Sequence, residues 1–132
     1  KITIGTAFPD EQEESMEIRG RDLITGLPKT LKITSKEVFE AMREPITSIV
    51  ESIKLTLEKT PPELASDVMD KGIMLTGGGA LLNGMDRLVQ QETGMPVHIA
   101  DNPLDCVVLG AGKALAEIET LKRIAVSTKN IR

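Results

Sequence analysis

A short apolar run that ends in three glycines restricts the fold of this chain more than any other feature. The run Ile73-Met74-Leu75-Thr76 does not alternate polar with apolar residues, which is typical of a strand buried on both faces of a sheet. Gly77-Gly78-Gly79 follow, and then a helical pattern extends from about Leu81 to Thr93. A strand over 97–100 and a helix opened by Asn102 repeat this order. The order strand, helix, strand, helix predicts a right-handed parallel α/β unit.

In the predicted α/β unit, apolar residues at helical spacing mark the face that each helix is expected to bury. A capping box at Thr60-Pro61-Pro62-Glu63 opens a helix that ends at Gly72. The helix over 81–93 ends at Gly94 and carries a stripe of Leu82, Met85, Leu88 and Val89. The last helix carries the stripe Leu104, Val107, Val108, Ala111, Leu115 and Ile118. We predict a core of Ile49, Ile53, Leu75, Val108 and Leu115, where two helices cover the parallel strands.

Period-two patterning dominates the first 34 residues. Three short segments place apolar residues on one face and polar residues on the other. Their apolar residues are Ile2 and Ile4, Met16 and Ile18, and Leu31 and Ile33. An acidic loop over 9–14 and a turn at Thr25-Gly26-Leu27-Pro28 separate the segments. The pattern predicts a small antiparallel three-stranded lobe with one face in water.

A helical region connects this lobe to the α/β unit. Thr34 and Glu37 form a capping box before it, because the hydroxyl can accept from a free amide and the carboxylate can reach back. A proline inside a helix removes a hydrogen bond and clashes with the preceding turn, whereas the first helical position tolerates it. We therefore predict a break or kink at Glu44-Pro45 and a second helix over 45–59, with the lobe boundary at this junction.

The glycine run is also the strongest candidate for a ligand site. A backbone without side chains can come into van der Waals contact with a ligand, and amides near a helix start can face a phosphate. The run also follows the carboxyl end of a strand, where open α/β sheets bind ligands. The alternative is a tight turn that needs only a positive φ, and the residues do not decide between the two. No Lys-Ser/Thr follows, as a P-loop requires, and Leu82 stands where a dinucleotide fingerprint has its third glycine.

Composition argues against several other functions. The chain has no Trp or Tyr, a net charge of −4 and a pI near 5.1, which disfavour a basic or aromatic surface for nucleic acid. Cys106 is the only cysteine, which excludes an internal disulfide and a cysteine-cluster zinc site. His98 is the only histidine, which argues against a multi-histidine metal site and a Ser-His-Asp triad. Asp101 and Asp105 are interpreted as residues of a helix start. We predict no catalytic residues and no metal ligands in this chain.

Several motifs along the chain resemble the MreB family of bacterial actin-like cell-shape proteins, including its Mbl branch. The two longest are Leu57-Glu58-Lys59-Thr60-Pro61-Pro62-Glu63-Leu64 and Gly72-Ile73-Met74-Leu75-Thr76-Gly77-Gly78-Gly79-Ala80-Leu81-Leu82. Others are Gly20-Arg21-Asp22-Leu23, Thr25-Gly26-Leu27-Pro28 and Asn102-Pro103-Leu104-Asp105-Cys106-Val107. The resemblance extends from Lys1 to about Leu121. It does not separate Mbl from MreB.

The resemblance implies half of an actin-like (ribonuclease H-like) α/β ATPase fold, in which four subdomains surround an ATP cleft. Residues 1–44 correspond to the small subdomain IIB and residues 45–132 to most of the larger subdomain IIA, with fraying expected after about residue 122. The family's Thr-Gly-Gly-Gly segment lines the adenosine side of the nucleotide. This segment maps onto Gly77, Gly78, Gly79 and Ala80, and Lys1 matches the lysine of a nucleotide-contacting Glu-x-x-Lys motif. The family's phosphate loops, Mg²⁺ environment, hydrolytic acid and membrane-inserting segments all precede the position of Lys1.

The implied function is that of a cytoskeletal protein. Such a protein binds ATP with Mg²⁺ and polymerises in the cytoplasm, on the inner face of the cell membrane, into filaments that direct cell-wall elongation and rod shape. Its implied partners are further copies of itself, the elongation machinery and membrane proteins such as RodZ. Because the chain starts at Lys1 without Met, we interpret it as a piece of a longer protein. Because the family's phosphate loops and hydrolytic acid precede the position of Lys1, we expect this piece alone to bind ATP weakly or not at all and not to hydrolyse it. The alternatives are a kinase of the actin/sugar-kinase superfamily and a plain α/β interaction domain.

Overall fold

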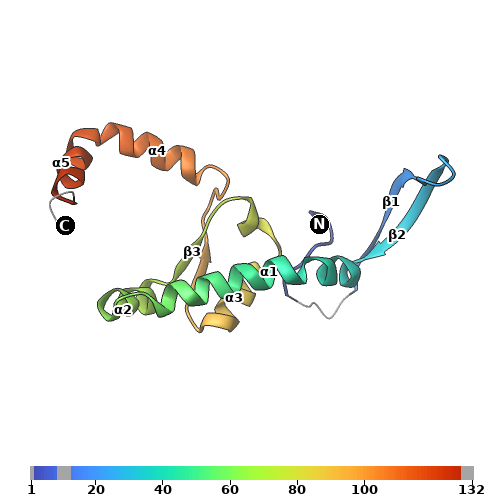
Figure 1. The fold of residues 1–132 in the computed structure, drawn as a ribbon, viewed down its shortest axis with the longest axis horizontal. Coiled ribbons are helices and arrows are strands. Elements are labelled where there is room, and N and C mark those ends of the chain that lie inside the picture. The colour runs from blue at the N-terminus through green and yellow to red at the C-terminus, as the bar shows by residue number, and fades with distance from the viewer. Residues whose placement is uncertain (1, 9–12, 129–132) are drawn as a thin grey trace.

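The computed structural model describes residues 2–8 and 13–128, with the side chains placed as far as residue 123. The elements are β1 (Ser15–Arg21), β2 (Pro28–Thr34), α1 (Ser35–Glu58), α2 (Pro62–Lys71), β3 (Ile73–Leu75), the 3₁₀ helix η1 (Gly78–Leu81), α3 (Met85–Thr93), β4 (Val97–Ile99), α4 (Cys106–Ala116) and α5 (Ile118–Thr128). The molecule is elongated, with the β1–β2 hairpin projecting at one end and α2 lying at the other (Figure 1). Helices α4 and α5 form an arm that leaves the central part (Figure 1). In the described part of the chain, no helix has both the length and the apolar character needed to cross a bilayer.

Strands β3 and β4 form the predicted parallel pair, with Ile73 opposite Val97 and Leu75 opposite Ile99. Gly72 makes this pairing possible, because its φ is +81° and a Cβ there would lie 2.5 Å from the Pro96 carbonyl oxygen. The Ile73 amide donates to that same oxygen at 2.7 Å. Burial of β3 on both faces is not seen, since Met74 is 59% exposed. The apolar run therefore predicts the strand correctly, but it does not predict which faces of the strand are covered in this chain.

The antiparallel lobe has two strands and not the predicted three. In the β1–β2 hairpin, Met16 lies opposite Ile33 and Ile18 opposite Leu31, as the alternation requires. The segment that contains Ile2 and Ile4 is a turn instead of a strand, so this part of the prediction is wrong. Within this segment Ile4 is buried, whereas Ile2 is fully exposed. Alternation over only three residues is too short to specify a strand.

Helix α1 begins as predicted and then continues through the predicted break. The Thr34 hydroxyl accepts from the Glu37 amide at 3.2 Å, and the Glu37 carboxylate accepts from the Thr34 amide at 2.8 Å, which confirms the capping box. Pro45 lies inside one uninterrupted helix, so a break at this residue is wrong. The physical reason is tertiary packing: Met42 before Pro45 and Ile46 after it both pack on the same core. The expected subdomain division at residues 44 and 45 falls inside this helix and stays a prediction.

Three of the predicted helix starts are displaced, including that of α4, which begins at Cys106 and not at Asn102. The Thr60 hydroxyl donates to the Thr56 carbonyl at 2.7 Å and does not cap α2, so the second capping box is wrong. Helix α3 begins at Met85, after η1 and after Gly84 with a φ of +73°, and not at Leu81. The predicted ends are confirmed, because Gly72 and Gly94 cap α2 and α3 with positive φ. Glycine is a strong stop signal for a helix, whereas hydroxyl residues have competing partners within the preceding turn.

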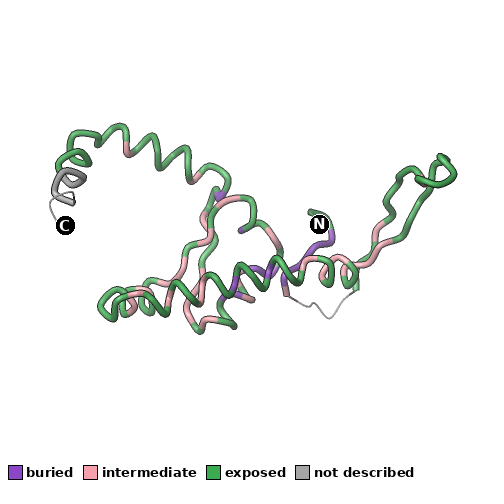
Figure 2. The backbone as a smooth tube through the Cα atoms, in the orientation of Figure 1, coloured by how far each residue is buried: buried purple, intermediate pink, exposed green. Residues whose placement is uncertain are grey.

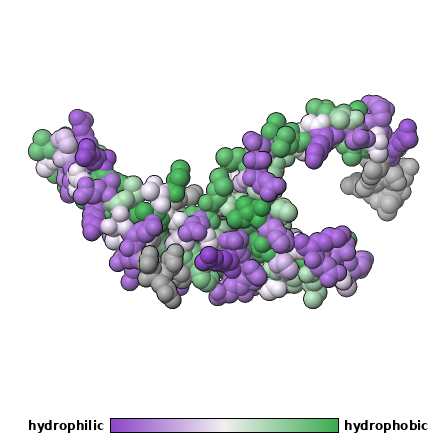
Figure 3. Space-filling model, turned by 180° about the vertical axis from the view of Figure 1, so that it is seen from behind, coloured by the Kyte–Doolittle hydropathy of each residue, from purple (hydrophilic) through white to green (hydrophobic). Residues whose placement is uncertain are grey.

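The core is small and lies where α1 and α3 meet the strand pair and the N-terminal segment (Figure 2). Its buried members are Ala7, Ile46, Met85 and Val89, and the partly buried Ile53 and Leu75 pack against it as predicted. The other predicted core residues, Ile49, Val108 and Leu115, are 48%, 65% and 70% exposed. That part of the prediction is wrong, because α4 does not fold back over the strands and none of its residues is buried. Figure 3 shows apolar side chains along the resulting arm.

Candidate functional site

The glycine run forms a turn that is tied to the loop after β4. Gly77 has a φ of +77° and a ψ of −179°, a conformation that favours glycine, so this residue is explained by the turn itself. Its amide donates to the Pro103 carbonyl at 2.7 Å. The turn closes with the Ala80 amide donating to the Gly77 carbonyl at 3.2 Å. Both strand-to-helix connections of the parallel unit therefore meet at one edge, where the carboxyl ends of β3 and β4 lie.

Gly78 and Gly79 are not explained by the backbone conformation. Neither has a positive φ. A Cβ on Gly79 would meet no atom within 4 Å, and a Cβ on Gly78 would meet only Leu104 Cδ2, at an ordinary 3.6 Å. The fold itself would accept a side chain at both positions. What glycine provides here is an open stretch of backbone, which is the arrangement that a closely approaching ligand requires.

A pocket of ≈ 360 Å³ lies beside this open backbone. One wall is formed by the N-terminal residues 2–6, and the other by Gly78, Leu81, Leu82 and Asn83. Glu14 and Ser35 complete the lining. The pocket therefore joins the hairpin end of the molecule to the glycine run, which sequence patterns did not predict.

A strap formed by residues 6–8 holds the N-terminal wall in place. Thr6 and Asn83 form an isolated parallel bridge, and the Ala7 amide donates to the Asn83 carbonyl at 2.7 Å. The Thr6 hydroxyl lies 2.6 Å from the Phe8 carbonyl and 3.2 Å from the Asn83 carbonyl, and donates to them. Gly84 leaves the space that the strap occupies, since a Cβ there would lie 2.6 Å from Phe8 Cβ. The Asn83-Gly84 pair could have indicated a turn, but nothing in the sequence indicates its partner.

The opposite side of the pocket is fixed by two reciprocal hydrogen bonds. The Ser35 amide donates to the Glu14 carbonyl at 2.8 Å, and the Glu14 amide donates to the Ser35 hydroxyl at 3.1 Å. These bonds join the start of β1 to the start of α1. Both hydrogen bonds use main-chain groups of Glu14, which is itself one of the lining residues of the pocket.

The predicted site residues are only partly brought together. Gly78 lines the pocket, and Gly77 and Gly79 flank it in the same turn. The Ala80 side chain is buried at 4% exposure and its amide is used within the turn, so its role would be to position the glycines. Lys1 lies outside the described residues. The assignment of all five residues to nucleotide stays a prediction.

Three further residues that the sequence offered as candidates, His98, Cys106 and Asp105, do not form a binding or catalytic arrangement. His98 lies exposed in β4, opposite Met74. The Cys106 thiol donates to the Asn102 carbonyl at 3.3 Å within one turn of chain. Asp105 precedes α4 without a side-chain capping bond. Among the described residues, no three His, Cys, Asp or Glu side chains lie close enough together to hold a metal ion.

Comparisons with known proteins agree on one family. The family model "MreB/Mbl protein" matches residues 1–123. The cell shape-determining protein Mbl of Bacillus subtilis is 49% identical over 127 residues, which is 96% of this chain and 38% of the relative. The cell shape-determining protein MreB of Escherichia coli is 49% identical over 119 residues, 90% of this chain and 34% of the relative. The chain thus spans little more than a third of the length of these relatives.

Two solved structures of a bacterial relative share the fold. MreB5 of Spiroplasma citri bound to ADP superimposes with a TM-score of 0.81 at 36% identity, over 92% of this chain and 37% of that one. MreB5 bound to AMPPNP gives a TM-score of 0.79 at the same 36% identity, over 93% and 37% of the two chains. The actin-like α/β fold implied by the sequence motifs is confirmed by this likeness.

Proposed function

The chain belongs to the MreB/Mbl family, and on that premise we propose that it is part of a bacterial actin-like filament protein that binds ATP. The protein would polymerise at the inner face of the cell membrane and direct cell-wall elongation and rod shape. Its partners would be further copies of itself and the elongation machinery, including membrane proteins such as RodZ. Curated relatives named as cell shape-determining proteins support this role.

The observation that carries nucleotide binding is the open backbone of Gly78 and Gly79 beside the pocket. At the carboxyl end of β3, glycines that are required neither by φ nor by packing leave the main chain open to a closely approaching ligand. The pocket joins apolar walls, such as Ile4 and Leu82, to a few polar groups, which suits the flat face and the polar edge of a purine. MreB5, which shares the fold, is known with ADP and with AMPPNP bound.

In this proposal the chain supplies one side of the nucleotide site. The glycine turn would contact the adenosine, and Lys1 would be a further nucleotide contact, as the family motif implies. Mg²⁺ would bind together with ATP and neutralise the negative charge of its phosphates. No three His, Cys, Asp or Glu side chains of the described residues lie close enough together to hold a metal ion, and we assign no Mg²⁺ ligand to this chain.

The test is a side chain placed on the open backbone. In the full-length protein, Gly79→Val and Gly78→Val should weaken ATP binding at least about tenfold, the equivalent of one hydrogen-bonded or close-packed contact, in a calorimetric titration. Gly110→Val provides the control, because a Cβ on that glycine also meets nothing within 4 Å but lies in α4. A folded Gly79→Val protein with unchanged ATP affinity would contradict the proposal.

A further inference from the structure

Thr6 is a buried polar residue at the point where the two walls of the pocket are joined. In the described part of the chain it is the only polar or charged residue that is buried, at 8% exposure. Burial of a hydroxyl costs free energy unless hydrogen bonds replace those that it makes with water. A valine side chain has nearly the same shape and would fill the same space without this requirement. The hydroxyl itself therefore needs an explanation.

The Thr6 hydroxyl is bonded on both sides within the protein. It lies 2.6 Å from the Phe8 carbonyl oxygen and 3.2 Å from the Asn83 carbonyl oxygen, and its one proton is shared between these two acceptors. Its oxygen accepts from the Phe8 amide at 3.2 Å. The bonds to Phe8 fold the strap on itself, and the contact with Asn83 attaches the strap to the connection between η1 and α3. One side chain thus shapes the strap and fixes its position.

The residue that the strap is attached to belongs to the opposite wall of the pocket. Thr6 lines the pocket at the end of the N-terminal wall, and Asn83 lines it at the end of the wall that begins with Gly78. The parallel bridge between Thr6 and Asn83, with the Ala7 amide donating to the Asn83 carbonyl at 2.7 Å, joins the two walls. A change in this bridge therefore changes the distance between the walls.

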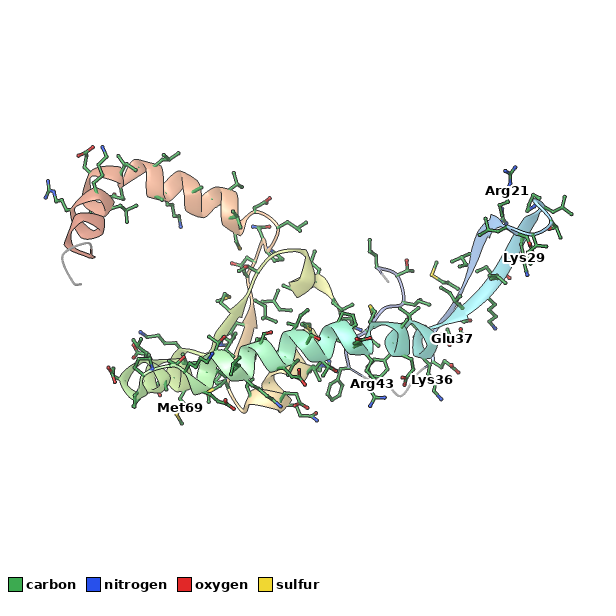
Figure 4. All side chains as sticks on the ribbon, in the orientation of Figure 1. Arg21, Lys29, Lys36, Glu37, Arg43 and Met69 are labelled. Atoms are coloured by element: carbon green, nitrogen blue, oxygen red, sulfur yellow. The ribbon has the colours of Figure 1, made fainter. Side chains whose placement is uncertain are left out.

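The N-terminal wall is anchored at the end that carries the strap. Ile4 and Ala7 are buried, whereas Ile2 is fully exposed. Ala7 belongs to the buried core cluster together with Ile46 of α1. Figure 4 shows the N-terminal segment meeting α1 in the half of the helix that carries the labelled Arg43. Because the wall is held at one end and open at the other, the strap decides where the wall lies.

We propose that Thr6 is a positioning residue for nucleotide binding, because its hydroxyl holds residues 2–6 at the distance from the glycine turn at which a ligand contacts both walls. The inference rests on the proposed function and deepens it. A ligand that contacts both walls binds only while the bridge is closed, so its measured affinity falls with the fraction of molecules in which the bridge is closed. By the same linkage, a bound nucleotide stabilises the closed bridge.

Calorimetric titration of the full-length protein with ATP tests the proposal through matched variants. Thr6→Val keeps the shape of the side chain but removes its hydrogen bonds, and should weaken ATP binding at least about fivefold. Thr6→Ser keeps the hydroxyl and should restore the affinity to within about twofold of the wild type. Thr93→Val is the control, because the Thr93 hydroxyl donates to the Val89 carbonyl at 2.7 Å and accepts from the Met95 amide at 3.2 Å. Thr93 does not line the pocket, so the same kind of loss there should leave ATP affinity unchanged.

A second pair of variants displaces the strap without changing Thr6. A Cβ on Gly84 would lie 2.6 Å from Phe8 Cβ, so Gly84→Ala should move the strap and weaken ATP binding by a similar factor. Gly72→Ala introduces a comparable clash away from the pocket, 2.5 Å from the Pro96 carbonyl oxygen, and should leave the affinity unchanged. Urea denaturation of each pair separates affinity from stability, because its two members should lose similar free energies of unfolding.

Wild-type ATP affinity in a folded Thr6→Val protein would overturn the inference. Equal losses of affinity in Thr6→Val and Thr93→Val would also overturn it, since they would reduce Thr6 to a structural role. If Thr6→Val does not fold, a Gly84→Ala protein with wild-type affinity overturns it alone. In each of these cases Gly79→Val should still weaken ATP binding, which leaves the proposed function intact. A full-length wild-type protein that does not bind ATP would contradict both proposals.

Discussion

Gly72 and Gly84 stand at positions where any side chain would collide with backbone or with a neighbouring residue. A Cβ would lie 2.5 Å from the Pro96 oxygen in the first case and 2.6 Å from Phe8 Cβ in the second, and both residues have positive φ. We expect Gly72→Ala and Gly84→Ala each to lower the free energy of unfolding by about 1–3 kcal/mol. Gly110→Ala, inside α4 with open space around it, should instead raise it by about 0.5–1 kcal/mol. Urea denaturation measures all three, and equal effects at the three sites would show that the described packing around residues 72 and 84 is wrong.

Asp22 gives the hairpin loop a dependence on pH. Hydrogen bonds from the Thr25 and Ile24 amides, and the Lys29 side chain, hold the pKa of Asp22 below its ordinary value of 3.8. The ionised form is therefore the one that the fold favours. The stabilisation of the loop is complete above pH 3.8 and is lost as the pH falls through the lower pKa of the folded protein. A ¹³C NMR titration should show the carboxyl of Asp22 titrating below 3.8, together with shifts of the Ile24 and Thr25 amides; an Asp22 pKa at or above that value would contradict the loop geometry.

At the scale of an element, α1 tolerates a proline that costs it a hydrogen bond. Pro45 lies inside the helix with its side chain exposed, and it cannot donate to the carbonyl one turn earlier. Pro45→Ala should therefore raise the free energy of unfolding by about 1–3 kcal/mol, which thermal denaturation measures. Pro62→Ala is the control, because Pro62 opens α2 where its missing amide has no helical partner; the change there should stay within about 0.5 kcal/mol. A destabilised Pro45→Ala variant would mean that the ring itself makes a needed contact.

The elements that local signals predicted are those whose partners are close in the sequence. The Thr34 capping box, the glycine stops of α2 and α3 and the β1–β2 hairpin all depend on residues within a few positions or one turn. The predictions that failed concern which apolar faces are covered by other parts of the chain. Periodicity identified the apolar stripe of α4 but not whether anything lies against it, and it could not show that Ile4 and Ala7 are buried outside the lobe. Likewise the glycine run indicated a site, while the wall contributed by residues 2–6 depends on a contact that no local pattern contains.

For the whole molecule, the uncovered arm dominates the expected behaviour in solution. Leu104, Val107, Val108 and Leu115 are 66%, 78%, 65% and 70% exposed, a larger apolar surface than a stable monomer of this size usually carries. We expect the chain to self-associate at high concentration without forming long filaments, since it spans 38% of a relative such as Mbl. Sedimentation velocity and electron microscopy test this expectation. ATP-dependent filaments made by this chain alone would contradict it, and Val107→Ser/Val108→Ser should reduce the self-association.

The strap that joins Thr6 to Asn83 also bears on the order in which the chain folds. The contact closes a loop of 77 residues, so its formation costs more chain entropy than the hairpin or any helix and should come after them. Once formed, it is also among the first long-range contacts to open, because a single bridge and a few hydrogen bonds secure it. The Ala7 amide, although buried, should accordingly exchange with deuterium well before the amides of α3 beside it. The pocket wall formed by residues 2–6 would then open and close locally, while the core stays folded.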